Sequence, residues 1–387
     1  MRVDFVITEL YVGGAERCLT ELAIGLAETG DEVRVFSLAR LPDGQQSQLV
    51  DRLKLPVARQ RVLVDRLLSA GIPVESGGAD SPTKFLAAYW KLRNWFDVSR
   101  PDVGQFFLHH ANVLGTFAAK ASGVQTRIGG LRVAEAKRLR CQIERSALKR
   151  MQGVVCVSQA VQQFAWDRLG CDADRSVVIP NGVDVTRFAS ASSMKWSEIG
   201  WPEDSIVSLF VGRLHPQKGI HLLQEQIDQI APAGSNRRLL LVGDGPLRSD
   251  LESWCNRIGG QRVQLLPWQS DIAPLIRACR VLLLPSHYEG MPNVVLEAMA
   301  AARPVVCSRV EGSKELLSHA AEQQSFPAGD GGALKNLVEQ FLSNETLCDQ
   351  IGELNQLRAR KDFSIAAMVD AYRSYYRTLL TRRLDSE

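Results

Sequence analysis

Several features that would place this 387-residue chain in a special class of protein are missing. Its apolar runs, such as 281–284, have strand length, far short of the roughly 18 residues that span a bilayer. The eight cysteines include no C-x-x-C pair, which disfavours a zinc or redox site and favours a reducing compartment. The chain has 46 Lys and Arg residues and 43 Asp and Glu residues, so neither sign of charge is in excess. This balance excludes a dedicated nucleic-acid binder.

The sequence does contain a regular alternation of short apolar runs and longer segments with helical period, which is typical of parallel sheets covered on both faces. The fold class is therefore α/β, with two Rossmann-like doubly wound sheets. The pattern restarts near Pro180, which predicts one domain over 1–180 and a second over 181–364. Strands are predicted at 3–7, 32–38, 103–108, 153–157, 176–179, 206–211, 238–242, 263–266, 281–284 and 305–307, and helices at 14–30, 58–70, 83–98, 112–121, 137–150 and 365–382.

An anion site is predicted after the strand at 281–284, since ligands of open parallel sheets lie beyond the carboxyl ends of strands. Pro292 suits a first helical turn, so the amides of 293–295 are expected to point outward with the positive end of the helix dipole. Glu289 precedes this helix, and Glu297 lies about 6 Å along its axis from the first residue. Both carboxylates would flank a bound diphosphate. Two solvated glutamates are the alternative interpretation of this spacing.

Other loops at strand ends carry groups that suit the same ligand. Arg213 and Lys218 follow the strand at 206–211 and offer a forked donor set and a point charge for a diphosphate. The Gly243–Gly245 turn follows the next strand, and Gly13–Gly14 opens the first helix, where the missing side chains allow close backbone approach. Neither glycine pair completes the G-x-G-x-x-G fingerprint, so an NAD-dependent dehydrogenase is disfavoured.

Together these residues match a known family. Glu289 and Glu297 form an E-x7-E element within EGMPNVVLEAMA, accompanied by GRLHPQKG, VGDGP, IPNGVD and an N-terminal GGAER. In this order the sequence closely resembles glycosyltransferase family 4, whose members are retaining enzymes of GT-B architecture. The resemblance implies two domains facing across a cleft, the first binding the acceptor and the second a nucleotide-sugar. It also implies that the C-terminal helix, about 365–387, returns to the first domain.

The resemblance implies a role for each site residue. Glu297 would bind the ribose, Glu289 would orient the transferred sugar, and Arg213 and Lys218 would clamp the diphosphate. Relatives often carry a catalytic histidine where Phe107 stands here, so His110 is the substitute candidate, with a packing or capping role as the alternative. The catalytic set is thus Glu289, Arg213, Lys218 and His110. The expected donor-binding residues are Gly13, Gly14, Arg213, Lys218, Leu266, Glu289, Gly290, Met291, Asn293, Val294 and Glu297.

Three positions depart from the family pattern or add to it. Ala302, in an Ala-Ala-Arg-Pro run, stands where relatives usually have glycine, and Glu311 stands where a glycine pair is common. The segment 137–150 has six basic residues and one acidic residue, and predicts a cationic amphipathic helix. Such a helix would dock on an anionic membrane surface, although a solvated helix face explains the same composition.

The expected function is transfer of a hexose or N-acetylhexosamine from a UDP- or GDP-sugar to a glycan or lipid-linked saccharide. We expect no cofactor and no nucleic-acid partner. We also expect no metal site, because we see no acidic Asp-x-Asp pair to hold a divalent ion. A non-hydrolysing nucleotide-sugar 2-epimerase and a non-catalytic partner in a glycan-assembly complex are the alternatives. The expected location is cytoplasmic, with peripheral docking on the inner face of the cell membrane left open.

Overall fold

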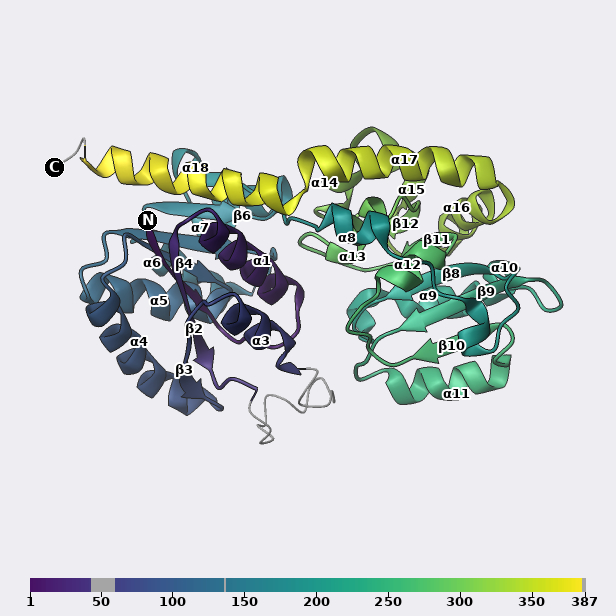
Figure 1. Ribbon diagram of the computed structural model, residues 1–387, viewed down its shortest axis with the longest axis horizontal. Coiled ribbons are helices and arrows are strands. Elements are labelled where there is room, and N and C mark those ends of the chain that lie inside the picture. Colours follow the sequence, from purple (N-terminus) through teal and green to yellow (C-terminus); the bar gives the residue numbers. More distant parts are fainter. Residues whose placement is uncertain (43–59, 136, 385–387) are drawn as a thin grey trace. The chain divides into compact units, whose positions relative to one another are not determined.

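The computed structural model describes residues 1–42, 60–135 and 137–384, and these form two compact units (Figure 1). Unit 1 holds the described residues up to Gly182 together with the segment from Ile365 onward. Unit 2 holds Val183–Ser364. The chain therefore changes unit twice, after residue 182 and after residue 364, where the sequence suggested boundaries after 180 and 364.

Unit 1 is built on a seven-stranded sheet in the order β3-β2-β1-β4-β5-β6-β7. All of its strand pairs are parallel, and Phe5 of the central strand lies beside Val35 on one side and Gln105 on the other. The six strands from β3 to β6 have the spatial order of a doubly wound dinucleotide-binding sheet. The strands are β1 (Arg2–Ile7), β2 (Glu32–Ala39), β3 (Val74–Ala79), β4 (Val103–Phe107), β5 (Thr126–Leu131), β6 (Gly153–Cys156) and β7 (Ser176–Val178).

Helices cover both faces of this sheet, and one of them comes from the end of the chain. Figure 1 shows this C-terminal helix, α18, lying along unit 1 beside α1. Its Tyr372 and Tyr376 are fully buried, and the Tyr376 hydroxyl lies 3.1 Å from Oε1 of the buried Gln105. The helices are α1 (Gly14–Glu28), α3 (Val62–Ser69), α4 (Phe85–Ser99), α5 (His109–Ala121), α6 (Arg138–Leu148), α7 (Gln159–Leu169) and α18 (Ile365–Leu384).

Unit 2 repeats the same plan with six strands in the order β10-β9-β8-β11-β12-β13. All of its pairs are parallel. The strands are β8 (Ile206–Val211), β9 (Arg237–Val242), β10 (Val263–Leu266), β11 (Val281–Leu284), β12 (Val305–Ser308) and β13 (Ser325–Phe326). The helices are α8 (Val185–Ser190), α9 (Ile220–Glu225), α10 (Ile227–Ile230), α11 (Arg248–Ile258), α12 (Ala273–Ala278), α13 (Asn293–Ala300), α14 (Ser313–Leu317), α15 (Ala321–Gln324), α16 (Gly331–Ser343) and α17 (Glu345–Asp362).

Three strands were not predicted from the sequence, and some helix starts were predicted at the wrong residue. Strand β3 reads Val-Glu-Ser-Gly-Gly-Ala, β5 contains the pair Gly129–Gly130, and β13 has two residues, so none has a strand-like composition. Helix α5 begins at His109 rather than 112. The helix predicted at 58–70 is observed as Val62–Ser69, and positions 58 and 59 lie outside the described residues.

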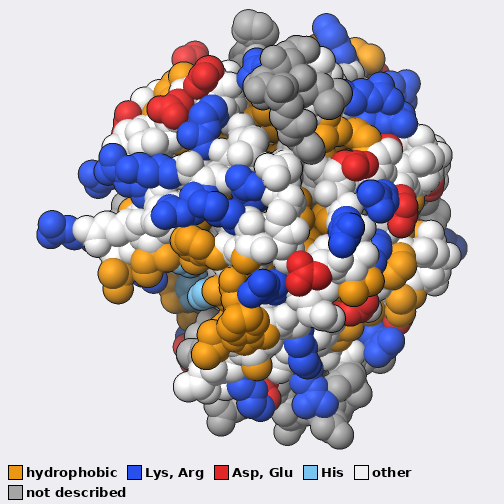
Figure 2. Space-filling model, turned by 90° about the vertical axis from the view of Figure 1, so that its left-hand side faces the viewer, with side chains coloured by type: hydrophobic (Ala, Val, Ile, Leu, Met, Phe, Trp, Pro, Cys, Tyr) orange, Lys and Arg blue, Asp and Glu red, His pale blue; other side chains and the backbone are white. Residues whose placement is uncertain are grey.

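One face of unit 1 carries exposed apolar side chains among basic ones. Leu86 and Trp90 on α4 are exposed, as are Leu139 and Ile143 on α6. Both helices pack against α5, which lies between them. Figure 2 shows groups of hydrophobic side chains on this side of the molecule, bordered by Lys and Arg, with a hollow in which a histidine is visible.

Candidate active site

The loops after β8 and β11 meet at the carboxyl edge of the unit 2 sheet, because these strands are neighbours. Lys218 ends a 3-10 turn, Pro216–Lys218, and its Nζ lies 2.5 Å from Oε1 of Glu289. The hydroxyl of Ser286 donates to the same oxygen at 2.6 Å. Glu289 is only 9% exposed, so its carboxylate is fixed between an ammonium group and a hydroxyl. The structure thus brings together two of the predicted catalytic residues.

Close backbone packing holds these two loops in place. The amide of His287 donates to the carbonyl of Gln217 at 2.8 Å, and the Gln217 side chain donates to the carbonyl of Tyr288 at 2.9 Å. Gly219 follows Lys218 with φ +62°, and a Cβ there would lie 2.0 Å from the Pro285 carbonyl oxygen. Only glycine fits this position, because it adopts the left-handed conformation without a side chain that would clash.

Helix α13 starts beside Glu289, with Pro292 as its N-cap residue and Asn293 as its first residue. The Val295 amide donates to the Pro292 carbonyl at 3.1 Å. The prediction that the amides of 293–295 all point outward is therefore wrong for Val295, because the first turn closes as a tighter 3-10 turn. Val294 is half-buried in that turn, and Glu297 is buried one turn further along α13.

The unusual Glu311 has a structural role in the same loop. Its Oε2 accepts the backbone N–H of Glu289 at 3.1 Å, so it anchors the residue that would orient the sugar. The adjacent Gly312 allows a close approach, since a Cβ there would lie 2.2 Å from the Gly290 carbonyl oxygen. Met291, next to Gly290, is buried. This close approach requires a glycine at position 312, beside Glu311.

Positive charge gathers at this edge. Arg213 is exposed in the loop after β8, and His215 lies between it and Lys218 in the sequence. Partial burial lowers the pKa of His215, and the charges of Arg213 and Lys218 lower it further. An anion bound here would therefore meet two permanent cations and an imidazole that is neutral at pH 7.

The turn Gly243–Gly245 links the loops after β9 and β10. The carboxylate of Asp244 accepts from the Arg248 side chain and from the Trp268 backbone N–H, both at 2.8 Å. A Cβ on Gly243 would lie 1.9 Å from the Gly212 carbonyl oxygen, so this turn packs tightly against the loop after β8. Leu266, the predicted base contact, is the half-buried last residue of β10.

In unit 1, the predicted residues also lie at helix starts. Gly13 is the N-cap residue of α1, and Gly14 is its first residue. His110 is the second residue of α5, and its ring stacks on Phe85 with centroids 5.1 Å apart. The packing role that the sequence left open for His110 is therefore present.

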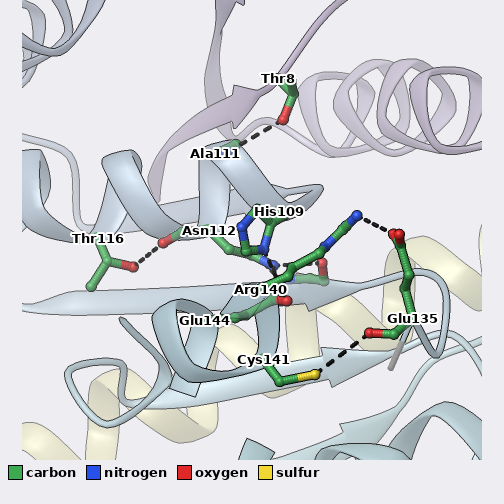
Figure 3. Close-up of polar contacts among 10 residues, drawn as sticks. Thr8, His109, Ala111, Asn112, Thr116, Glu135, Arg140, Cys141 and Glu144 are labelled. Atoms are coloured by element: carbon green, nitrogen blue, oxygen red, sulfur yellow. Dashed lines mark hydrogen bonds and ion pairs between the residues drawn. The ribbon is translucent and has the colours of Figure 1, made fainter. Parts of the chain in front are cut away.

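Sequence reasoning missed His109, which the structure places in a polar network (Figure 3). Its Nδ1 lies 3.1 Å from Oε2 of the buried Glu144 on α6. The resemblance aligns the family's histidine with Phe107 and leaves His110 as the substitute, and no local signal in the sequence pairs His109 with a glutamate 35 positions away.

An Asp-x-Asp pair does exist, contrary to our expectation, at Asp172 and Asp174. It lies just before β7, at the amino end of that strand, so it is at the opposite edge of the sheet from His110. Asp172 pairs with Arg175 at 3.3 Å. Within the described part of the chain, no group of three or more His, Cys, Asp or Glu side chains is arranged to hold a metal ion.

Two family models match the two halves of this chain. The model described as Glycosyltransferase Family 4 matches residues 12–187, and the one described as Glycosyl transferases group 1 matches residues 205–344. The chain belongs to glycosyltransferase family 4. The resemblance seen in its motifs is thereby confirmed, and so is the two-sheet GT-B fold class.

Curated relatives of this glycosyltransferase are also transferases. The UDP-Gal:alpha-D-GlcNAc-diphosphoundecaprenol alpha-1,3-galactosyltransferase of Escherichia coli is 27% identical over 68% of this chain and 72% of its own length. The phosphatidyl-myo-inositol mannosyltransferase of Mycobacterium leprae is 26% identical over 92% of this chain and 91% of its own length. Neither is an epimerase, so these relatives give the epimerase alternative no support.

A solved structure shares the fold of the enzyme. Alr3699/HepE of Anabaena in complex with UDP-glucose superposes with a TM-score of 0.79 at 22% identity, over the whole of both chains. At that identity the likeness concerns the fold alone. The site residues named above therefore stay predictions, located by the structure but not yet tested.

Proposed function

We propose that this enzyme is a retaining, metal-independent glycosyltransferase. It would transfer a hexose or N-acetylhexosamine from a UDP- or GDP-sugar to a glycan or lipid-linked saccharide. The observation that carries this proposal is the contact of Lys218 Nζ with the buried Glu289 carboxylate beside the start of α13. A cation for the leaving diphosphate and a carboxylate for the sugar thus lie at the same edge of unit 2.

The leaving group accounts for the cations. Breaking the bond between the sugar and the diphosphate develops negative charge on the phosphate oxygens, and preorganised positive groups lower the energy of that transition state. Arg213, Lys218 and the amide of Val294 would supply that charge without a metal ion. The Escherichia coli relative, whose name gives UDP-Gal as its donor, supports a UDP-sugar over the other donors.

Retention is proposed from the family resemblance, and the way Glu289 is held is compatible with it. Its Oε1 is engaged by Lys218 and Ser286, so this carboxylate is better suited to orient sugar hydroxyls than to attack the anomeric carbon. We propose attack on the same face of the sugar, assisted by the leaving phosphate, which needs no carboxylate nucleophile. Glu297, buried on α13, would bind the ribose.

Calorimetric titration with UDP, GDP and ADP, with and without EDTA, tests the donor site. We expect one nucleotide to bind with micromolar affinity that EDTA does not change. Glu297→Ala should weaken that binding, whereas Glu289→Ala should spare it and abolish transfer. Absence of binding by all three nucleotides would overturn the donor proposal, and loss of binding with EDTA would overturn metal independence.

For the acceptor side, we propose docking on an anionic membrane surface through 137–150. Helix α6 exposes Leu139 and Ile143, one turn apart, rather than burying them. Arg138, Arg145 and Lys149 are exposed on the same helix, a combination suited to the headgroup region of an anionic bilayer. No described helix is long and apolar enough to cross a membrane. Such docking would place the enzyme at the inner face of the cell membrane, where the acceptors of the lipid-linked relatives would be met.

Vesicle flotation tests this surface. We expect binding to vesicles with phosphatidylglycerol at low salt, release at 0.5 M NaCl, and no binding to phosphatidylcholine alone. The double variant Leu139→Ser with Ile143→Ser should lose binding. The matched control changes Leu354 and Leu357, exposed on α17, to serine and should retain it. Binding that salt does not change would contradict the proposal.

A further inference from the structure

The turn between β4 and α5 holds a histidine whose protonation can be assigned from its neighbours. His109 Nδ1 lies 3.1 Å from Oε2 of Glu144, and the Glu144 side chain is 8% exposed. Asn112 Nδ2 donates to the other carboxylate oxygen at 2.9 Å. Figure 3 shows the three side chains converging from α5 and α6.

The orientation of the Asn112 amide is fixed by the backbone of β5. Its Oδ1 accepts the Gly130 N–H at 3.1 Å, and its Nδ2 donates to the Gly130 carbonyl at 3.1 Å. Reversing this amide would place its NH2 group against the Gly130 N–H and its oxygen against the Gly130 carbonyl. Nδ2 therefore faces Glu144. Oε1 of Glu144 is therefore an acceptor, and in an ionised carboxylate Oε2 is an acceptor as well.

The proton on His109 follows from this arrangement. Because Glu144 Oε2 can only accept, the hydrogen of the contact belongs to Nδ1 of His109. In the neutral imidazole, Nε2 then has a lone pair and no hydrogen. A histidine oriented by a buried carboxylate in this way is suited to accept a hydrogen bond at Nε2.

The backbone before His109 is strained in a way that a purely structural turn does not need. Leu108 has φ +72° and ψ +160°, a region that is essentially restricted to glycine. Such strain persists where the surrounding structure enforces it, and it gathers at functional sites. Here the Ala111 amide donates to the Thr8 hydroxyl at 3.3 Å, which links the start of α5 to the end of β1.

His109 also reaches the surface. Its side chain is 12% exposed, and unit 1 contains only two histidines, His109 and His110. Both histidines lie at the carboxyl edge of the sheet, where ligands of such folds bind.

We infer that His109 binds the saccharide acceptor through Nε2, which accepts a hydrogen bond from an acceptor hydroxyl, and that Glu144 is its positioning residue. The inference rests on the proposed transferase function and makes His109, rather than the substitute candidate His110, the histidine that acts at this edge. It predicts an acid limit to acceptor binding, because protonation of Nε2 turns this acceptor into a donor.

His109→Asn is the direct test, because the asparagine amide can still donate to Glu144 while no Nε2 remains. With GlcNAc-diphosphoundecaprenol as acceptor and UDP-galactose as donor, we expect kcat/KM for the acceptor to fall about tenfold or more. UDP affinity should stay within twofold. The acid limb of the kcat/KM profile should disappear in this variant.

Glu144→Gln and His110→Asn sharpen the test. Glu144→Gln should give a smaller loss of kcat/KM for the acceptor and a shifted acid limb, because the glutamine amide lets either nitrogen of the His109 ring carry the hydrogen. Glu353→Gln, at an exposed glutamate on α17, is the matched control for a lost carboxylate. A loss confined to His110→Asn, or an unchanged acid limb in His109→Asn, would overturn the inference.

A spectroscopic measurement separates this inference from the transferase proposal. A long-range ¹H–¹⁵N spectrum of the full chain should show His109 protonated at Nδ1 and bare at Nε2 near pH 7.5, with His109→Asn identifying its signals. The opposite tautomer would overturn the inference whatever the activity. An inactive wild type that shows the expected tautomer would instead count against the proposed reaction or acceptor.

Discussion

The two sheets share one strand order but differ at their carboxyl edges. In unit 2 that edge has Arg213 and Lys218, tightly packed glycine turns and the buried carboxylate of Glu289. In unit 1 the corresponding edge has a strained turn at Leu108 and a histidine held by a buried carboxylate. The strand order fixes where a ligand binds, whereas the loops decide which ligand it is.

The difference fits two kinds of ligand. A diphosphate needs permanent positive charge and close backbone approach, and unit 2 offers both. A neutral saccharide needs directional hydrogen bonds instead, for which a histidine with a defined tautomer is suited. Unit 1 adds exposed apolar and basic side chains on α4 and α6, the helices that pack against α5.

The largest expected effect comes from removing the carboxylate of unit 2. Glu289→Gln should lower kcat by roughly 10²–10³-fold, as for loss of one oriented group that acts in the transition state. Steady-state transfer from UDP-galactose measures it, with UDP affinity unchanged. Glu339→Gln, which breaks the Arg237 pair at the surface of the same unit, is the control and should retain full activity. Wild-type kcat in Glu289→Gln would remove Glu289 from the site.

The glycine packing of unit 2 is tested next. Gly219→Ala adds a Cβ 2.0 Å from a carbonyl oxygen and should cost more than about 2 kcal/mol of stability, because the backbone must move. Gly200 has a similar φ of +76° with open space around it. Gly200→Ala should therefore cost only about 1 kcal/mol, the strain of the left-handed conformation. Equal shifts in thermal unfolding for the two variants would contradict the packing argument.

Relieving the backbone strain at Leu108 in unit 1 should have a smaller effect on stability, and it should stabilise the protein rather than destabilise it. Leu108→Gly should relieve backbone strain, offset in part by the lost side chain, and change stability by about 1 kcal/mol or less while reducing transfer. Ala302 in unit 2, at φ +55°, offers the comparison. Ala302→Gly should stabilise by a similar amount and leave transfer unchanged. If Leu108→Gly also transfers at the wild-type rate, the strain has no role in function.

The smallest effect is a pH dependence of donor binding. The pKa of His215 lies below its ordinary 6.5 in the free enzyme, and a bound diphosphate should raise it by offsetting the nearby cations. Binding therefore takes up protons, so the affinity for UDP-glucose should rise roughly threefold from pH 7.5 to 5.5. Calorimetry measures this, and His215→Gln should flatten the profile. Affinity that falls with decreasing pH would contradict the assigned position of His215.

The fold was largely predictable from the sequence because each half alternates apolar runs with helical segments. Strand β3 was not, since Gly77 and Gly78 make its composition that of a turn and only pairing with β2 makes it a strand. In the site, the E-x7-E motif located Glu289. Its contact with Lys218, 71 residues away, depends on β8 and β11 becoming neighbours, which no local pattern encodes.

The histidine shows the limit of motif reasoning. Phe107 occupies the position where relatives often carry a histidine, and His110 is the predicted substitute, but His109 is the residue whose ring nitrogen contacts Glu144. That contact depends on α5 and α6 packing side by side, and on the Asn112 amide that aligns the carboxylate. Nothing in the sequence around these residues indicates that their side chains are in contact.

The return of α18 to unit 1 determines the order in which the protein can fold during synthesis. The described residues of unit 2 form one continuous stretch, so they are all present once residue 364 has left the ribosome, even though they are translated second. The core of unit 1 stays incomplete until Tyr372 and Tyr376 have been synthesised, near the end of translation. A nascent or truncated chain that lacks this helix would therefore have a finished unit 2 and a unit 1 with an open core.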